Sequence, residues 1–122
     1  MVIIANYMKR LVFFFLMALT FLSQGIVFAG NNVTKRFNVN GVCEKCKARI
    51  ENAAYIKGVK YADWNVDTHD LTVKYDSTKT SPEIILKNIA KSGHDNELFK
   101  AEDADYNKIP SCCKYRSGIK KH

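Results

Sequence analysis

The sequence lacks the motifs that most enzymes carry. Its 122 residues contain no phosphate-binding glycine loop, no nucleophile triad and no recognisable catalytic base, so we expect no enzymatic activity. The length excludes a large multidomain enzyme and allows one domain of ordinary size. Acidic side chains are few, 12 against 19 basic ones, which gives a formal net charge of +7. The basic residues are mostly scattered and show no interleaved aromatic pattern. We therefore expect no nucleic-acid partner, only solubility and a mild attraction to anionic surfaces.

Long apolar runs are also absent except near the N-terminus. There Lys9 and Arg10 precede the apolar run Leu11–Leu22, and Val27 and Ala29 place small side chains at positions −3 and −1 of a cleavage site. This order is typical of a secretory signal peptide. The run is shorter than the ~20 residues that a spanning helix needs, although an uncleaved membrane anchor is the alternative. We predict a signal peptide at residues 1–29 and a mature protein that is periplasmic or secreted.

The rest of the chain predicts a small α+β domain over residues 30–100. Apolar side chains at helical spacing, among them Cys46, Ile50 and Ala54, indicate one helix, and Ser81 caps a second helix that ends before Gly93. Alternating apolar side chains predict strands at 33–39, 59–66, 71–75 and 97–100. The order is that of the ferredoxin-like βαββαβ fold, a four-stranded antiparallel sheet with two helices on one face. Residues 101–122 are expected to form an extended polar tail.

Cys43 and Cys46 form a C-x-x-C motif where the first predicted helix begins. This spacing lets both sulfur atoms turn toward one ion, and the positive end of the helix favours the thiolate form. Two thiolates suit Cu(I), Ag(I) or Hg(II), whereas Zn(II) prefers four ligands. Such motifs also occur in disulfide oxidoreductases and in structural bridges. A thiol–disulfide redox protein that uses Cys43 and Cys46 is therefore the main alternative, and a structural adaptor is a third.

The residues around the motif carry a family resemblance. The segment FNVNGVCEKCKARIE, residues 37–51, resembles the start of a heavy-metal-associated (HMA) domain. This is the fold of copper chaperones, of metal domains in P-type ATPases and of the periplasmic mercuric-ion-binding protein. The resemblance extends over about residues 33–100 and implies that Cys43 and Cys46 are metal ligands. The family usually has methionine two residues before the first cysteine, packed under the loop, where this chain has Gly41.

Cys112 and Cys113 lie beyond the part of the chain that the resemblance explains. Three interpretations are open. In the first, the pair adds thiolates to Cys43 and Cys46 in a three- or four-sulfur site. In the second it binds metal independently, and in the third it forms disulfides with the motif or between chains. A bond between the two adjacent cysteines themselves is the least favourable disulfide, because its geometry is strained.

The three histidines have different expected roles. His94 follows the second predicted helix, where a neutral imidazole could supply a third metal ligand, and Asp95 could orient its ring. His69 is expected in a hairpin turn at the opposite end of the sheet from the motif, and His122 is terminal. We expect His69 and His122 to be inert.

These observations predict an exported, monomeric, soft-metal-binding protein. It would hold Cu(I), or alternatively Hg(II), Ag(I) or Zn(II), on Cys43 and Cys46 and carry the ion to a membrane transporter or efflux protein. Transfer would proceed by ligand exchange, in which an incoming thiolate forms a three-coordinate ion before one original sulfur leaves. Because this exchange needs an open site, we expect both sulfur atoms to be exposed.

Overall fold

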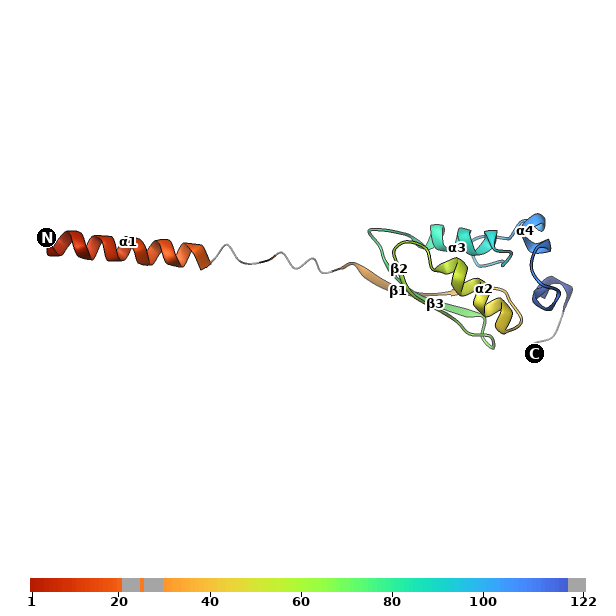
Figure 1. The fold of residues 1–122 in the computed structure, drawn as a ribbon. Coiled ribbons are helices and arrows are strands. Elements are labelled where there is room, and N and C mark those ends of the chain that lie inside the picture. The colour runs from red at the N-terminus through yellow and green to blue at the C-terminus, as the bar shows by residue number, and fades with distance from the viewer. Residues whose placement is uncertain (21–24, 26–29, 119–122) are drawn as a thin grey trace.

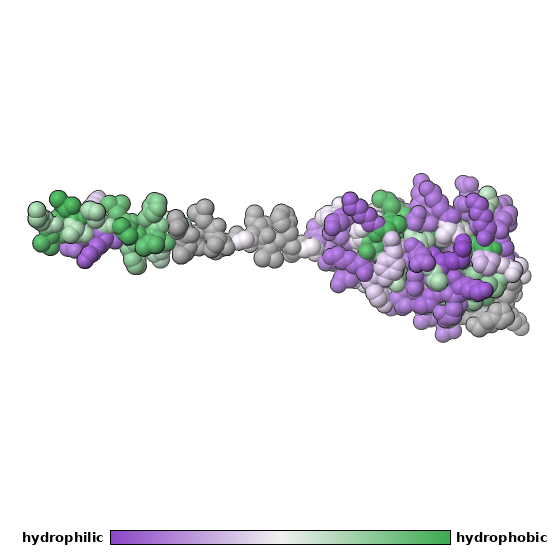
Figure 2. Space-filling model, viewed as in Figure 1, coloured by the Kyte–Doolittle hydropathy of each residue, from purple (hydrophilic) through white to green (hydrophobic). Residues whose placement is uncertain are grey.

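The computed structural model describes residues 1–20, 25 and 30–118. Its first element, helix α1 (Val2–Thr20), is drawn apart from the rest of the chain, and its apolar side chains are exposed (Figures 1 and 2). Among the described residues, no helix combines the length and the apolar character needed to cross a membrane. The predicted cleavage site before Gly30 lies largely outside the described residues, so the signal peptide stays a prediction.

A three-stranded antiparallel sheet follows α1 in the described chain. Strands β1 (Asn32–Asn38), β2 (Val59–Trp64) and β3 (Asp70–Asp76) are arranged in the order β1-β3-β2. Because β1 and β3 are antiparallel, the end of β1 lies beside the turn that joins β2 to β3, and the amide of Val39 donates to the carbonyl of His69 at 2.9 Å. The prediction that His69 lies at the opposite end of the sheet from the motif is therefore wrong.

The predicted fourth strand at residues 97–100 does not form in the described chain. The chain before this segment forms one isolated bridge, between Val39 and Asn96, and the amide of Glu97 donates to the carbonyl of Asn38 at 3.3 Å, but no strand ladder continues. The Asn96 side chain explains the interruption, because its Oδ1 accepts hydrogen bonds from the amides of Leu98 at 3.2 Å and Phe99 at 3.0 Å. These local bonds turn the backbone and compete with the strand ladder. The α+β class is confirmed, and the four-stranded detail is not.

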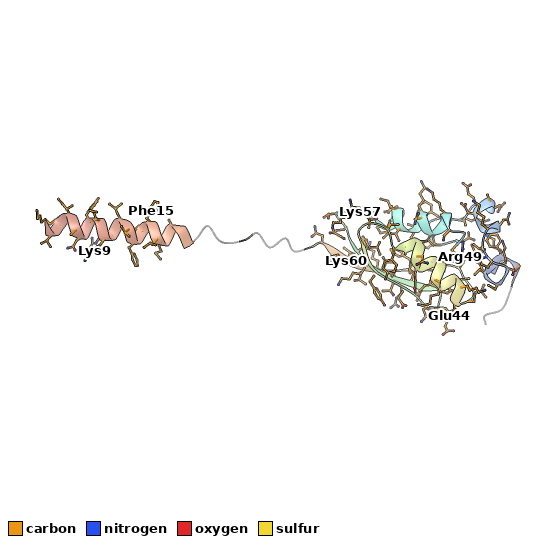
Figure 3. All side chains as sticks on the ribbon, viewed as in Figure 1. Lys9, Phe15, Glu44, Arg49, Lys57 and Lys60 are labelled. Atoms are coloured by element: carbon orange, nitrogen blue, oxygen red, sulfur yellow. The ribbon has the colours of Figure 1, made fainter. Side chains whose placement is uncertain are left out.

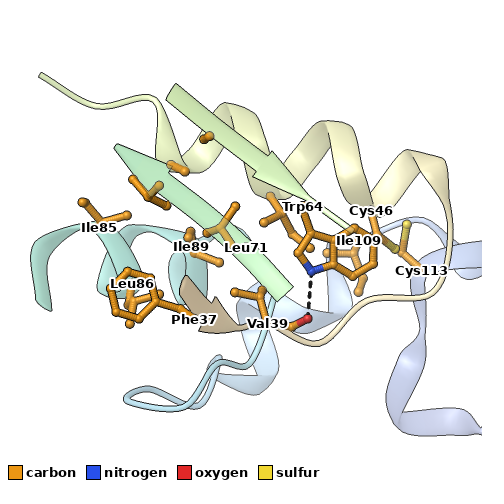
Figure 4. Close-up of a cluster of buried hydrophobic side chains, with 14 of the residues drawn as sticks. Phe37, Val39, Cys46, Trp64, Leu71, Ile85, Leu86, Ile89, Ile109 and Cys113 are labelled. Atoms are coloured by element: carbon orange, nitrogen blue, oxygen red, sulfur yellow. Dashed lines mark hydrogen bonds between the residues drawn. The ribbon is translucent and has the colours of Figure 1, made fainter. Parts of the chain in front are cut away.

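Two helices pack with the sheet around one core. Helix α2 (Glu44–Ala54) buries Cys46 and Ile50, while α3 (Pro82–Lys91) buries four apolar side chains. Alternate residues of the strands complete the core, and Figure 4 shows Trp64 and Leu71 between the helices and the sheet. The Ser81 hydroxyl caps α3 by accepting from the amide of Ile84 at 3.4 Å, as predicted. Charged side chains such as Lys57, Lys60 and Glu44 project from the surface (Figure 3).

The C-terminal segment is folded rather than extended. It contains the short helix α4 (Asp103–Asn107) and the 3₁₀ helices η2 (Ser111–Cys113) and η3 (Tyr115–Ser117). Ile109 and Cys113 are buried and join the core of the domain. The segment returns to the end of the domain where α2 begins (Figure 1). The prediction of an extended tail is wrong because these apolar side chains find a place in the core.

Candidate metal centre

The start of α2 positions the two motif cysteines. Cys43 has an extended backbone at the N-cap position, and Cys46 lies in the first turn of the helix. Their Sγ atoms are 3.9 Å apart, so the two thiols face each other. Cys46 is fully buried and Cys43 is only 8% exposed. The expectation that both sulfur atoms are exposed is therefore wrong.

The C-terminal segment provides the cover over the motif. The Sγ of Cys113 lies 3.9 Å from the Sγ of Cys43, and the carbonyl oxygen of Cys112 lies 3.7 Å from the same sulfur. The sulfur atoms of Cys43, Cys112 and Cys113 all lie within 4.8 Å of one another, and all four cysteines of the chain are free thiols. Cys112 is the most exposed of them. Of the three interpretations for Cys112 and Cys113, this geometry favours a site shared with the motif.

The environment of Cys43 favours its thiolate. Burial acts to raise the pKa of this thiol, but hydrogen bonds from the backbone amides of Cys46 and Lys45 outweigh burial and lower the pKa below its ordinary value. Cys113 differs, because burial and its contacts with the Cys46 and Cys43 thiols raise its pKa strongly. The lowered pKa favours the thiolate of Cys43, the form that binds a cation, whereas the raised pKa of Cys113 favours its thiol form in the absence of an ion.

His94 contacts the loop that leads into the motif. Its ring is fully buried, and Nδ1 lies 2.8 Å from the carbonyl oxygen of Asn40. Its Nε2 has no hydrogen-bond partner among the described residues. Burial, helped by the charge of Arg49, lowers the pKa of His94 to about 4 despite the bond to Asn40. The contact with Asn40 holds the loop before the motif, and the role of His94 as a third metal ligand stays a prediction.

Sequence reasoning missed two features of the centre. The first is the role of Gly41, where a Cβ atom would lie 2.9 Å from the Trp64 ring and 3.0 Å from the Cβ of Cys46. The second is the carboxylate of Asp95, which binds Arg116 of the C-terminal segment at 2.7 Å instead of orienting His94. Neither contact has a local pattern in the sequence, because each joins segments that are far apart along the chain.

Comparisons with known proteins agree with this geometry. The model of the heavy-metal-associated domain matches residues 36–95. The solved structure of the CopZ metallochaperone is 32% identical, with a TM-score of 0.51, and the match covers 52% of this chain and 98% of CopZ. The chain belongs to the heavy-metal-associated domain family.

A second solved structure supports the fold of this HMA domain. It is a protein from Bacillus anthracis, 21% identical, with a TM-score of 0.53; the match covers 57% of this chain and 100% of that protein. At this identity the likeness concerns the fold alone. Among functionally curated proteins, none matches the chain. The region matched by the family model ends at residue 95, before the C-terminal segment that carries Cys112 and Cys113.

Proposed function

We propose that this HMA protein binds one soft metal ion, Cu(I) first among them, on the thiolates of Cys43 and Cys46 and delivers it to a membrane transporter or efflux protein. The observation that supports this most directly is the pair of thiols 3.9 Å apart at the start of α2, in a chain of the metal-binding HMA family. Soft thiolates select Cu(I), and Hg(II) or Ag(I) would suit the same donor pair. The proposed carrier has no catalytic turnover.

The chemistry of loading follows from the two thiols. Both sulfur atoms bind as thiolates, so loading releases protons to solvent. The hydrogen bonds that lower the pKa of Cys43 favour the thiolate at that residue. Release reverses these steps: a thiolate of the partner forms a bond to the ion, and one sulfur of this protein leaves. The buried position of both sulfur atoms requires that the C-terminal segment moves during this exchange.

An anaerobic Cu(I) titration of the reduced full-length protein tests the binding. With a chromophoric chelator as competitor, the wild type is expected to take up one Cu(I), and C43S/C46S is expected to lose this binding. Parallel titrations with Ag(I), Hg(II) and Zn(II) rank the ions. Uptake that is equal in the wild type and in C43S/C46S would contradict the proposal.

We also propose that residues 1–29 direct export and are then removed. The support is the order of basic pair, apolar run and small residues in the sequence. Fractionation of producing cells, followed by intact mass measurement, is expected to find the protein outside the cytoplasm and beginning at Gly30. A control in which Lys9 and Arg10 are replaced by Glu should reduce export. A protein that keeps Met1–Ala29 after secretion would contradict cleavage.

Thiol–disulfide exchange is the second candidate function. The lowered pKa of Cys43, with Cys46 and Cys113 both 3.9 Å from its sulfur, is also suited to attack on a disulfide. In that reaction the Cys43 thiolate forms a mixed disulfide with one substrate sulfur, the other sulfur leaves as a thiolate, and a second cysteine resolves the intermediate. Catalytic reduction of a model disulfide, with a defined potential, would favour this candidate. A metal carrier is expected to show negligible turnover.

A further inference from the structure

We propose that the C-terminal segment supplies Cys113 as a third thiolate ligand, so that three sulfur atoms, those of Cys43, Cys46 and Cys113, hold the ion. This inference rests on the proposed function, because it extends the ligand set of the same site. It assigns the segment beyond the matched HMA region a direct part in binding.

The spacing of the sulfur atoms supports three-coordinate binding. With metal–sulfur bonds of about 2.3 Å, two sulfur atoms on opposite sides of an ion are about 4.6 Å apart, whereas three in a trigonal plane are about 4.0 Å apart. The Sγ of Cys43 lies 3.9 Å from the Sγ of Cys46 and 3.9 Å from that of Cys113. The Sγ of Cys43 therefore lies at trigonal spacing from one sulfur of the motif and from one sulfur of the C-terminal segment.

The choice of Cys113 over Cys112 follows from how each lies. Cys113 is fully buried, and its sulfur lies 3.9 Å from the sulfur of Cys43. Cys112 is partly exposed, and its sulfur is grouped with those of Cys43 and Cys113, while Cys46 is outside that group. Cys113 therefore lies in the interior beside Cys43, and Cys112 lies at the outer side.

A set of polar contacts holds Cys113 in this position. The guanidinium of Arg116 binds the carboxylate of Asp95 at 2.7 Å and the carbonyl of Ala101 at 2.7 Å. The hydroxyl of Tyr115 donates to the carbonyl of Gly93 at 2.9 Å and accepts from the amide of Asp95 at 2.8 Å. These bonds attach the residues just after Cys113 to the loop after α3, so the position of the third sulfur is fixed by the fold.

The same loop is tied to the segment before the motif. The amide of Asn40 donates to the carbonyl of Asp95 at 2.8 Å, and the carbonyl of Asn40 is in contact with Nδ1 of His94. Asp95 thus bonds both to the chain that leads into Cys43 and to the segment that carries Cys113. The three sulfur atoms are positioned by one continuous hydrogen-bonded network, which is what preorganised metal ligands require.

X-ray absorption of the full-length protein, loaded anaerobically with one equivalent of Cu(I), tests the inference. The wild type is expected to show three sulfur neighbours at about 2.3 Å from the ion. C113S is expected to show two sulfur neighbours and an affinity lower by about tenfold or more, measured by chelator competition. The matched control is C112S, which removes the adjacent thiol and should keep three sulfur neighbours.

The outcomes separate the inference from the proposed function. Two sulfur neighbours in the wild type, with unchanged affinity in C113S, would mean that Cys113 only packs the core, and would overturn the inference while leaving the carrier function intact. Loss of the third sulfur in C112S but not in C113S would also overturn it. Failure of the wild type to bind Cu(I) would contradict the proposed function itself. Because the wild-type spectrum needs no substitution, the test holds even if C113S folds poorly.

Discussion

The indole ring of Trp64 occupies the space that any side chain at residue 41 would need. A Cβ atom on Gly41 would lie 2.9 Å from two ring carbons, and the ring itself is fixed by a hydrogen bond of 3.0 Å from Nε1 to the carbonyl of Val39. The ring is fully buried under the loop that leads to Cys43. The family resemblance assigns methionine to this position of the loop, and here the tryptophan from β2 fills the space beneath it.

The replacement G41A tests this contact. The added methyl group would press on the Trp64 ring and on Cys46, and overpacking of this kind costs about 1–3 kcal/mol. We expect the free energy of unfolding to fall by that amount in urea, together with weaker Cu(I) binding. G30A is the control, since a Cβ atom there would meet only the flexible side chain of Asn32, at 3.3 Å. Equal stability of the two variants would show that the loop adapts freely.

The ion pair between Asp95 and Arg116 gives a second prediction. D95N removes the negative charge that Arg116 contacts at 2.7 Å, and both side chains are mostly buried. We expect the C-terminal segment to loosen, with a loss of about 1–3 kcal/mol in stability and faster alkylation of Cys113. D103N is the matched control, because Asp103 meets the same guanidinium at 3.3 Å but its side chain is 92% exposed. Similar effects of D95N and D103N would contradict the claim that the ion pair between Asp95 and Arg116 holds the C-terminal segment in place.

Buried His94 makes stability depend on pH. Its pKa is about 4 in the folded protein, mainly because of burial, against an ordinary 6.5, so the unfolded chain binds this proton first. The contribution of His94 to the free energy of unfolding is therefore fully present above pH 6.5. It is lost as the pH decreases from 6.5 to 4, by about 3 kcal/mol in total. Urea unfolding at a series of pH values measures this slope.

H94N should remove the slope between pH 6.5 and 4, since an amide at this position can donate to Asn40 without titrating. H122N is the control and should keep it. The pKa of the Asp95 carboxyl is lowered from its ordinary 3.8, so its contribution to stability is lost only below about pH 3.8. That range lies below the one in which His94 takes up its proton. A slope that H94N leaves unchanged would show that another group is responsible.

The four cysteines should react at different rates with an alkylating agent. Cys112 is partly exposed and Cys43 is 8% exposed with a lowered pKa, whereas Cys46 and Cys113 are fully buried. We expect Cys112 to be modified first and Cys46 and Cys113 last, as followed by mass spectrometry of the reduced protein. One equivalent of Cu(I) should then protect Cys43. Modification of Cys113 as fast as Cys112 would mean that the C-terminal segment does not cover the motif.

Patterns within single elements account for what the sequence predicts correctly. The helical spacing of Cys46, Ile50 and Ala54 and the capping residue Ser81 depend on neighbours along the chain, and both helices form as predicted. The C-x-x-C motif likewise places its two sulfur atoms face to face through local geometry. The family follows from the motif and the order of elements together.

Contacts between distant segments account for what the sequence does not predict. The missing last strand is a local exception, because the Asn96 side chain accepts hydrogen bonds from the nearby amides of Leu98 and Phe99 and turns the backbone there. The C-terminal segment has a polar composition, yet its buried side chains Ile109 and Cys113 attach it to the core. The ion pair between Arg116 and Asp95 joins residues that are far apart in the sequence, so no local pattern predicts it. The burial of the motif, which the sequence predicts to be open, is the consequence.

A crystal structure of the full-length protein loaded with one equivalent of Cu(I), with the ion located by its anomalous scattering, tests the central claim most directly. The account predicts a single ion between the sulfur atoms of Cys43 and Cys46, with Cys113 as the third neighbour. An ion bound elsewhere on the chain would contradict the account, and so would a reduced motif that takes up no ion.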